Sequence, residues 1–208
     1  MSPPDWQRKP ELATVSNPEG DRLVEADPER LRSLVSQSVA RLDSTKLIAI
    51  DGPAGSGKTT LASQWHDFLQ SSGLTVETLH LDDLYEGWTG LRRELETRLI
   101  DQVLDPLASG QVARWQRYDW HAGAFAEWVE LTPPKVLVLE GCGSGAQTYS
   151  PYTSLLVWIE AEQEERIARG IKRDGPGVLP HWLAWMDREA AHFAANRTRD
   201  RADLHLTT

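Results

Sequence analysis

The sequence is poor in cysteine and in long apolar runs. Cys142 is the single cysteine among 208 residues, which excludes an intramolecular disulfide framework and a cysteine-rich zinc site. No stretch approaches the roughly 20 apolar residues that a membrane-spanning helix needs. The first residues also lack the apolar segment of a secretory signal. We therefore expect a cytoplasmic protein with no membrane partner.

Basic residues are outnumbered as well. The chain has 22 lysines and arginines against 31 acidic residues, a formal net charge of −9. The arginines are interleaved with carboxylates and form no basic tract, so polynucleotide binding is not expected. We expect a small-molecule partner, and the sequence leaves a homo-oligomer open.

The length suits one medium domain. Residues 1–26 contain four prolines and little apolar periodicity, which predicts a flexible N-terminal tail. A single domain is then expected over residues 27–208. Asp27 and Pro28 form a helix start, and apolar residues at helical spacing extend that helix to about Leu42.

Apolar runs and helical patterns alternate along the rest of the chain. This alternation predicts an α/β fold, a doubly wound parallel sheet with flanking helices. The glycine-rich motif described below makes the expected fold that of a P-loop NTPase. The expected strands are 47–50, 75–81, 136–139, 155–159 and, more weakly, 203–206. The expected helices are 58–70, 91–107, 162–172 and 180–196.

Residues 108–134 are rich in aromatic side chains and have no clear period. We expect an irregular lobe over the carboxyl ends of the strands, where ligands bind in open α/β sheets. The alternative is a satellite hydrophobic cluster beneath a long loop.

A glycine-rich segment follows the first strand and opens a helix. Residues 52–59 read GPAGSGKT and match the phosphate-binding Walker A pattern G-x-x-x-x-G-K-[ST] in its strand-to-helix context. Glycines let backbone N–H groups approach a phosphate, the helix N-terminus favours an anion, and the threonine hydroxyl suits Mg²⁺. We expect ATP (or another nucleoside triphosphate) and Mg²⁺ to bind here. The expected contacts are Gly52, Ala54, Gly55, Ser56, Gly57, Lys58, Thr59 and Thr60.

Carboxylates end the second and third strands. Asp82 and Asp83 follow the second strand, and strand alternation predicts that only one of them faces the nucleotide. Such a carboxylate could accept the proton of a reacting hydroxyl. Glu140 follows four apolar residues and, with Thr59, is the expected metal ligand. The alternatives are a solvated Asp-Asp turn and a glutamate that only begins a loop.

These motifs, with Tyr85 and Tyr118-Asp119-Trp120, occur in an order that resembles the uridine kinase and phosphoribulokinase-like P-loop kinases. The resemblance covers roughly residues 45–175 and implies Asp82 as the catalytic carboxylate. Leu84 stands where that family has an aromatic residue. The substrate-binding residues that the resemblance implies are Asp83, Tyr85, Tyr118, Asp119 and His121.

The resemblance also implies a lid at approximately 166–180. Arg166, Arg169 and Arg173 repeat at helical spacing and could neutralise charge on a transferring phosphoryl group. Lys58, Arg169 and Arg173 are thus the expected catalytic cations. The alternative is a solvated helix face paired with neighbouring glutamates.

The expected activity is ATP- and Mg²⁺-dependent phosphoryl transfer to a hydroxyl of a small metabolite, foremost a nucleoside. One alternative is a nucleoside monophosphate kinase, whose basic acceptor pocket would use Arg92, Arg93 and Arg98. Another is a nucleotide-binding switch protein with little turnover. No guanine-recognition motif is present to support a GTPase.

Overall fold

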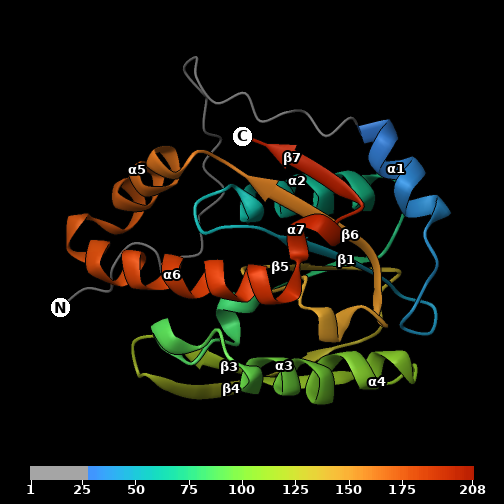
Figure 1. Ribbon diagram of the computed structural model, residues 1–208. Coiled ribbons are helices and arrows are strands. Elements are labelled where there is room, and N and C mark those ends of the chain that lie inside the picture. Colours follow the sequence, from blue (N-terminus) through green and yellow to red (C-terminus); the bar gives the residue numbers. More distant parts are fainter. Residues whose placement is uncertain (1–27) are drawn as a thin grey trace.

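The computed structural model describes residues 28–208, so the expected tail over residues 1–26 lies outside the described part. A five-stranded parallel sheet with the strand order β2-β5-β1-β6-β7 forms its centre (Figure 1). Helices pack on both faces, which confirms the predicted α/β, doubly wound P-loop fold. The strands are β1 (Lys46–Asp51), β2 (Val76–His80), β5 (Val136–Glu140), β6 (Thr153–Glu160) and β7 (Leu204–Thr207).

Alternation along the central strands divides the core into two layers. In β1, Ile48 and Ile50 face one side of the sheet, whereas Leu47 faces the other. β5 divides in the same way between its valines and its leucines. Both strands are apolar on both faces, as expected for a parallel sheet covered on each side.

Helices α1 (Pro28–Gln37) and α2 (Lys58–Ser71) cover one face. The predicted end of α1 near Leu42 was wrong, because Leu42 pairs with Thr45 in a tight turn and packs into the core of the opposite face. The leucine fits the helical period, but its contacts belong to another layer. Local periodicity cannot separate these two cases.

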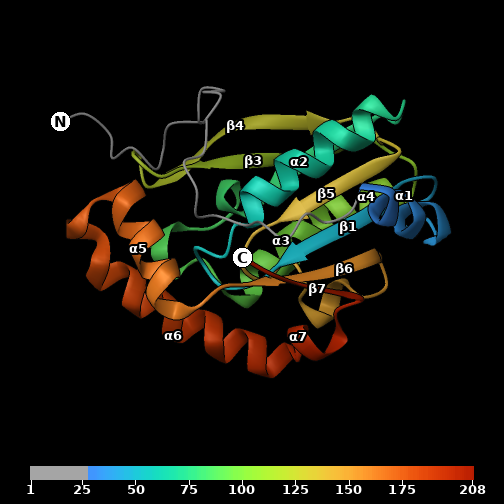
Figure 2. The ribbon, with the colours of Figure 1, turned by 90° about the horizontal axis from the view of Figure 1, so that it is seen from above.

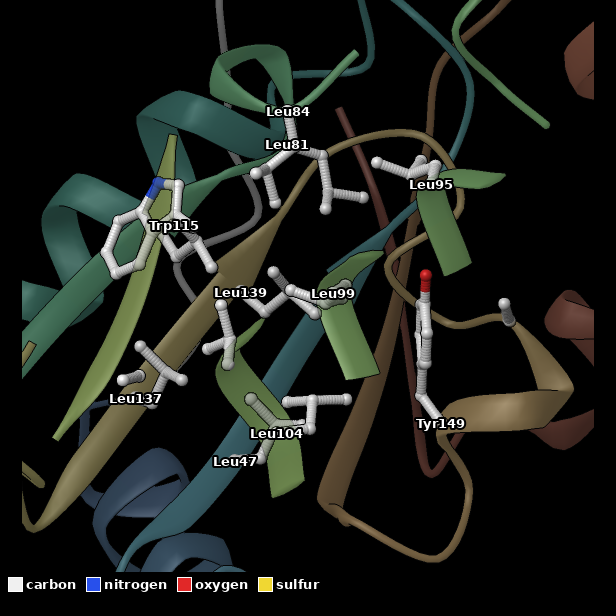
Figure 3. Packing of buried hydrophobic residues seen from close by; sticks show 14 of the residues in the cluster. Leu47, Leu81, Leu84, Leu95, Leu99, Leu104, Trp115, Leu137, Leu139 and Tyr149 are labelled. Atoms are coloured by element: carbon white, nitrogen blue, oxygen red, sulfur yellow. The ribbon is translucent and has the colours of Figure 1, made fainter. Parts of the chain in front are cut away.

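The other face is covered by α3 (Arg93–Leu99), a π-helical turn η4 (Ile100–Leu104) and α4 (Asp105–Ala108). Pro106 has no N–H for the carbonyl four residues earlier, and the π turn accommodates this gap in the predicted continuous helix. Figure 3 shows leucines of this segment packed against the sheet. The labelled side chains include Leu95, Leu99 and Leu104 from the helical segment and Leu47, Leu137 and Leu139 from the strands.

An antiparallel hairpin replaces the irregular lobe that we expected over residues 108–134. Strands β3 (Ala113–Asp119) and β4 (Ala124–Leu131) form a separate two-stranded sheet. Trp115 packs into the core (Figure 3). Trp128 on β4 is exposed. The pattern is hard to detect because a register irregularity between Gln116 and Tyr118 interrupts the alternation.

The C-terminal third returns over the sheet through α5 (Gln163–Asp174) and α6 (Leu179–Asn196). Figure 2 shows that the arrowheads of β1 and β5 point toward the side on which α5 lies. No helix within residues 28–208 is long and apolar enough to cross a bilayer. The short elements are η2 (Leu81–Asp83), η3 (Gly87–Thr89), η5 (Gln147–Tyr149), η6 (Pro176–Val178) and α7 (Thr198–Arg201).

Candidate active site

The phosphate loop lies between the end of β1 and the start of α2. Gly52 has φ +147°, and a β-carbon there would come 1.9 Å from the carbonyl oxygen of Ile159. Gly57, with φ +95°, precedes the first residue of α2. The local backbone therefore demands glycine at both positions, and it leads directly into a helix N-terminus that can bind an anion.

Asp51, which the sequence analysis did not single out, links the phosphate loop to the loop that follows β5. Its fully buried carboxylate accepts hydrogen bonds from the N–H groups of Gly52, Gly143 and Gly145, each at 2.8 Å. Burial raises the pKa of Asp51 to about 6, although the three N–H donors act in the opposite direction. An acid that ends a strand directly before a phosphate loop was the available signal.

The side chain of Lys58 folds back toward the first residues of the phosphate loop. Its ammonium donates to the carbonyls of Gly52 at 2.7 Å and Pro53 at 2.9 Å, and the residue is buried. Burial disfavours the charged form, but nearby carboxyl groups, including Glu189 and Glu140, raise the pKa of Lys58. A charged ammonium is therefore held where phosphate oxygens would bind.

Thr59 and Glu140, the expected metal ligands, lie side by side. The Thr59 hydroxyl donates to Oε1 of Glu140 at 3.1 Å, and Nδ1 of His80 lies 2.6 Å from the same oxygen. The hydrogen bond to Glu140 raises the pKa of His80. Within residues 28–208 no cluster of three or more His, Cys, Asp or Glu side chains is placed to hold a metal ion. A hydroxyl and one carboxylate nevertheless fit Mg²⁺, which takes its remaining ligands from phosphates and water.

A cavity of about 250 Å³ opens beside these groups. It joins the phosphate loop to Asp82, to Glu140 and to α5 and α6. Ser56 does not line the cavity, and its buried hydroxyl makes no hydrogen bond within the described chain. Of the predicted residues, the cavity is lined by Ala54, Gly55, Gly57, Lys58, Thr59, Thr60, Asp82, Tyr85, Glu140, Arg169 and Arg173.

Asp82 and Asp83 lie in the η2 turn rather than in a strand, so strand alternation does not separate them. Asp82 lines the cavity and Asp83 does not. Asp82 is open to the cavity, but the surrounding protein desolvates its carboxylate. This desolvation, with the charge of Glu140, raises the pKa of Asp82 to about 6. Such a group is suited to accept a proton near neutral pH.

The structure does not bring Tyr118, Asp119 and His121 to this cavity. Asp119 instead accepts hydrogen bonds from the backbone N–H groups of His121 and Ala122 in the hairpin turn. Trp120, which lies between them, lines the cavity and donates its indole N–H to the carbonyl of Asp82 at 2.8 Å. Trp120 and His121 follow the last residue of β3 and lie in the turn of the hairpin, so strand alternation does not predict which of them faces the cavity.

Tyr85 lines the cavity wall with its ring. Its buried hydroxyl donates to the carbonyl of Cys142 at 2.6 Å, so that group is already engaged within the protein. The ring packs edge-on against Trp185 of α6. The acceptor-binding role given to Tyr85 stays a prediction, and the structure favours ring contact over hydroxyl recognition.

The three arginines of the expected lid have different surroundings. Arg169 donates to the Gly55 carbonyl at 3.2 Å and pairs with Glu165, while Arg173 forms a two-bond pair with Asp174. Both line the cavity. Arg166 is buried behind the phosphate loop and does not line the cavity.

Glu189 on α6 contacts the phosphate loop, and the sequence analysis did not identify it as a site residue. Its Oε1 pairs with Arg166 at 3.1 Å, and its Oε2 accepts the N–H of Ala54 in the phosphate loop at 2.8 Å. Both charges are buried. The Glu189 carboxylate therefore connects α5, α6 and the phosphate loop.

Replacing Glu189 with glutamine is expected to lower the free energy of unfolding by about 3–5 kcal/mol, because Arg166 would keep a buried charge without its counterion. Urea denaturation measures this loss. Glu127→Gln, which breaks the exposed pair with Arg117 on the hairpin, serves as the control and should leave the midpoint almost unchanged. Equal midpoints for the two variants would show that the Arg166–Glu189 pair does not stabilise the fold.

Comparison with known proteins supports the architecture. A possible uridine kinase from Bacillus stearothermophilus is 20% identical with a TM-score of 0.58, and the alignment covers 85% of this chain and 97% of that one. A candidate fructose transport system kinase from Silicibacter sp. gives 20% and 0.60, with coverage of 86% and 97%. D-glycerate 3-kinase from Cryptococcus neoformans gives 14% and 0.55, with coverage of 84% and 88%.

Models of known protein families gave no match to the chain, and neither did the sequences of curated proteins. At sequence identities of 14–20%, structural similarity shows a shared fold only. The chain therefore shares its α/β fold with these proteins.

Proposed function

We propose that this protein is an ATP-dependent kinase that transfers a phosphoryl group to a hydroxyl of a small metabolite, with Mg²⁺. One observation carries the proposal: a single cavity is lined by the phosphate loop, by Asp82 and by a separate set of aromatic side chains. Such a cavity has room for a nucleotide phosphate on one side and for an acceptor on the other.

Each group then has a chemical task. The loop amides, Lys58, Arg169 and Arg173 would bind and neutralise the phosphoryl oxygens. Thr59 and Glu140 would hold Mg²⁺, which supplies charge neutralisation when it is bound. Asp82 would orient the acceptor hydroxyl and take its proton.

The fold neighbours support a small-molecule kinase, since they include proteins described as a possible uridine kinase, a fructose transport system kinase and a D-glycerate 3-kinase. The nucleoside monophosphate alternative gains no support from the cavity, because Arg92, Arg93 and Arg98 do not line it. Arg98 instead pairs with Glu86 and donates to the Leu84 carbonyl. The nucleoside acceptor expected from the sequence remains a prediction.

A coupled assay of ADP release tests the proposal. The full chain with MgATP is given uridine, cytidine, nucleoside monophosphates, sugars and small amino alcohols in turn. A kinase releases ADP much faster with one acceptor than without any. Slow hydrolysis that no acceptor stimulates would instead indicate a switch protein.

A further inference from the structure

The part of the cavity beyond Asp82 is walled by aromatic rings, which we call the aromatic chamber. They come from the turns after β2, from the β3–β4 hairpin and from α6. The chamber consists of Tyr85, Trp88, Trp120, Trp182 and Trp185. Four of the nine tryptophans of the chain thus line one small cavity.

The rings meet at steep angles. Trp88 lies 5.9 Å from Trp120 at 74° and 6.2 Å from Trp185 at 79°, while Tyr85 and Trp185 lie 5.0 Å apart at 66°. Walls at such angles enclose a corner, whereas a flat base is usually held by a ring parallel to it. The chamber therefore suits a compact, rounded group.

The size of the cavity points the same way. Its whole volume is about 250 Å³, below the roughly 300–1,000 Å³ of sites that bury drug-sized ligands, and the phosphate side shares it. This limits the acceptor to a small molecule.

Hydrogen-bond donors on these walls are already engaged with the protein. The indole N–H of Trp120 donates to the Asp82 carbonyl, and that of Trp182 donates to Oδ2 of Asp174 at 3.0 Å. A sugar or a nucleobase needs polar partners for its several hydroxyl or ring groups. The chamber instead presents ring surfaces.

Negative charge lies beside the rings. The carboxylate of Asp82 lines the same cavity, and the aromatic faces themselves attract cations. Asp174 is already paired with Arg173, and Lys58 and Arg169 lie on the phosphate side of the cavity. Trp182 already has the guanidinium of Arg173 at 5.8 Å from its ring centre. The ring faces that line the cavity and the Asp82 carboxylate together could hold a cation that the ligand brings.

We propose that the phosphoryl acceptor is a small alcohol that carries a compact ammonium group, held in the aromatic chamber with its hydroxyl at Asp82. This rests on the proposed kinase function. In the reaction the acceptor oxygen bonds to the γ-phosphorus, the bond from that phosphorus to the bridging oxygen of ADP breaks, and the hydroxyl proton passes to the Asp82 carboxylate.

Binding of choline and of its neutral isostere 3,3-dimethylbutan-1-ol tests the charge. With the full chain and MgADP, choline is expected to quench tryptophan fluorescence at saturation. Its Kd should be lower than that of the isostere by a factor of about ten or more. Ethanolamine and its N-methylated forms complete the series. Equal affinity for choline and its isostere would overturn the proposal, as would binding of none of the ammonium alcohols.

Variants locate the site. Trp88→Leu should abolish choline binding, whereas Trp88→Phe keeps a ring and should retain part of it. Trp128→Leu is the control, since Trp128 is 48% exposed on β4 and does not line the cavity. Loss of binding in Trp128→Leu, or full binding in Trp88→Leu, would contradict the chamber as the site.

MgATP binding, measured calorimetrically on the same samples, separates this inference from the proposed function. Bound MgATP without any ammonium binding, or tighter binding of uridine or fructose, removes the inference and leaves the kinase proposal intact. Absence of MgATP binding removes the kinase proposal itself.

Discussion

Replacing Asp82 with asparagine is expected to lower kcat by a factor of about 10²–10⁴, the range found for loss of a general base. The amide retains the size of the side chain but cannot take the proton of the acceptor hydroxyl. MgATP affinity should change little, because the loop amides and Lys58 provide that binding. Steady-state kinetics with the acceptor found in the screen measure the loss.

Two neighbours serve as comparisons. Asp83→Asn should cost far less than Asp82→Asn, because Asp83 does not line the cavity, and Asp67→Asn on the exposed side of α2 should leave kcat unchanged. Similar losses for the Asp82 and Asp83 variants would contradict the assignment.

The pH profile gives a second signature of Asp82. Its pKa is raised to about 6, so the carboxylate is ionised above that pH and protonated below it. A base must be ionised to act, so kcat/KM should fall as the pH drops through about 6. The Asp82→Glu variant should retain an acidic limb, and the residual activity of Asp82→Asn should lose it.

Replacing Lys58 with alanine is expected to lower kcat by a factor of about 10²–10³, comparable with the loss of one donor to transition-state charge. The ammonium is buried and is held by the carbonyls of Gly52 and Pro53, at the place where phosphate oxygens would bind. MgATP affinity should also fall, since this contact is made before the transition state is reached.

Lys135→Ala is the matched control for Lys58→Ala. Lys135 is exposed at the amino end of β5, the opposite end of the strand from Glu140. Its removal should change neither kcat nor affinity. Unaltered kinetics in Lys58→Ala would exclude the phosphate-binding role of the loop lysine.

The parts of the fold that the sequence predicts correctly are those encoded by one contiguous segment of the chain. The apolar runs at 47–50 and 136–139 need both faces buried, and this alone indicates central parallel strands. The phosphate loop is contiguous, so its residue types and spacing carry the whole signal. That a carboxylate follows β2 is also local information, but the choice of Asp82 over Asp83 came from the family resemblance, because both lie in the η2 turn.

The rest depends on contacts between distant segments. Glu189 and Ala54 are 135 residues apart, and only the packed α6 brings the carboxylate to the loop. In the sequence, Trp182 and Trp185 indicate only the apolar face of a helix. The packing of α6 against the rest of the protein brings them to the cavity. The β3–β4 hairpin escaped detection because its register is irregular.

Isothermal titration of the full chain with MgATP tests the account most directly. We expect one nucleotide per chain, weaker binding when Lys58 becomes alanine, and competition by MgADP. A folded protein that takes up neither adenine nor guanine triphosphate in the presence of Mg²⁺ would contradict the account, since every assigned role begins from a phosphate held at residues 52–60.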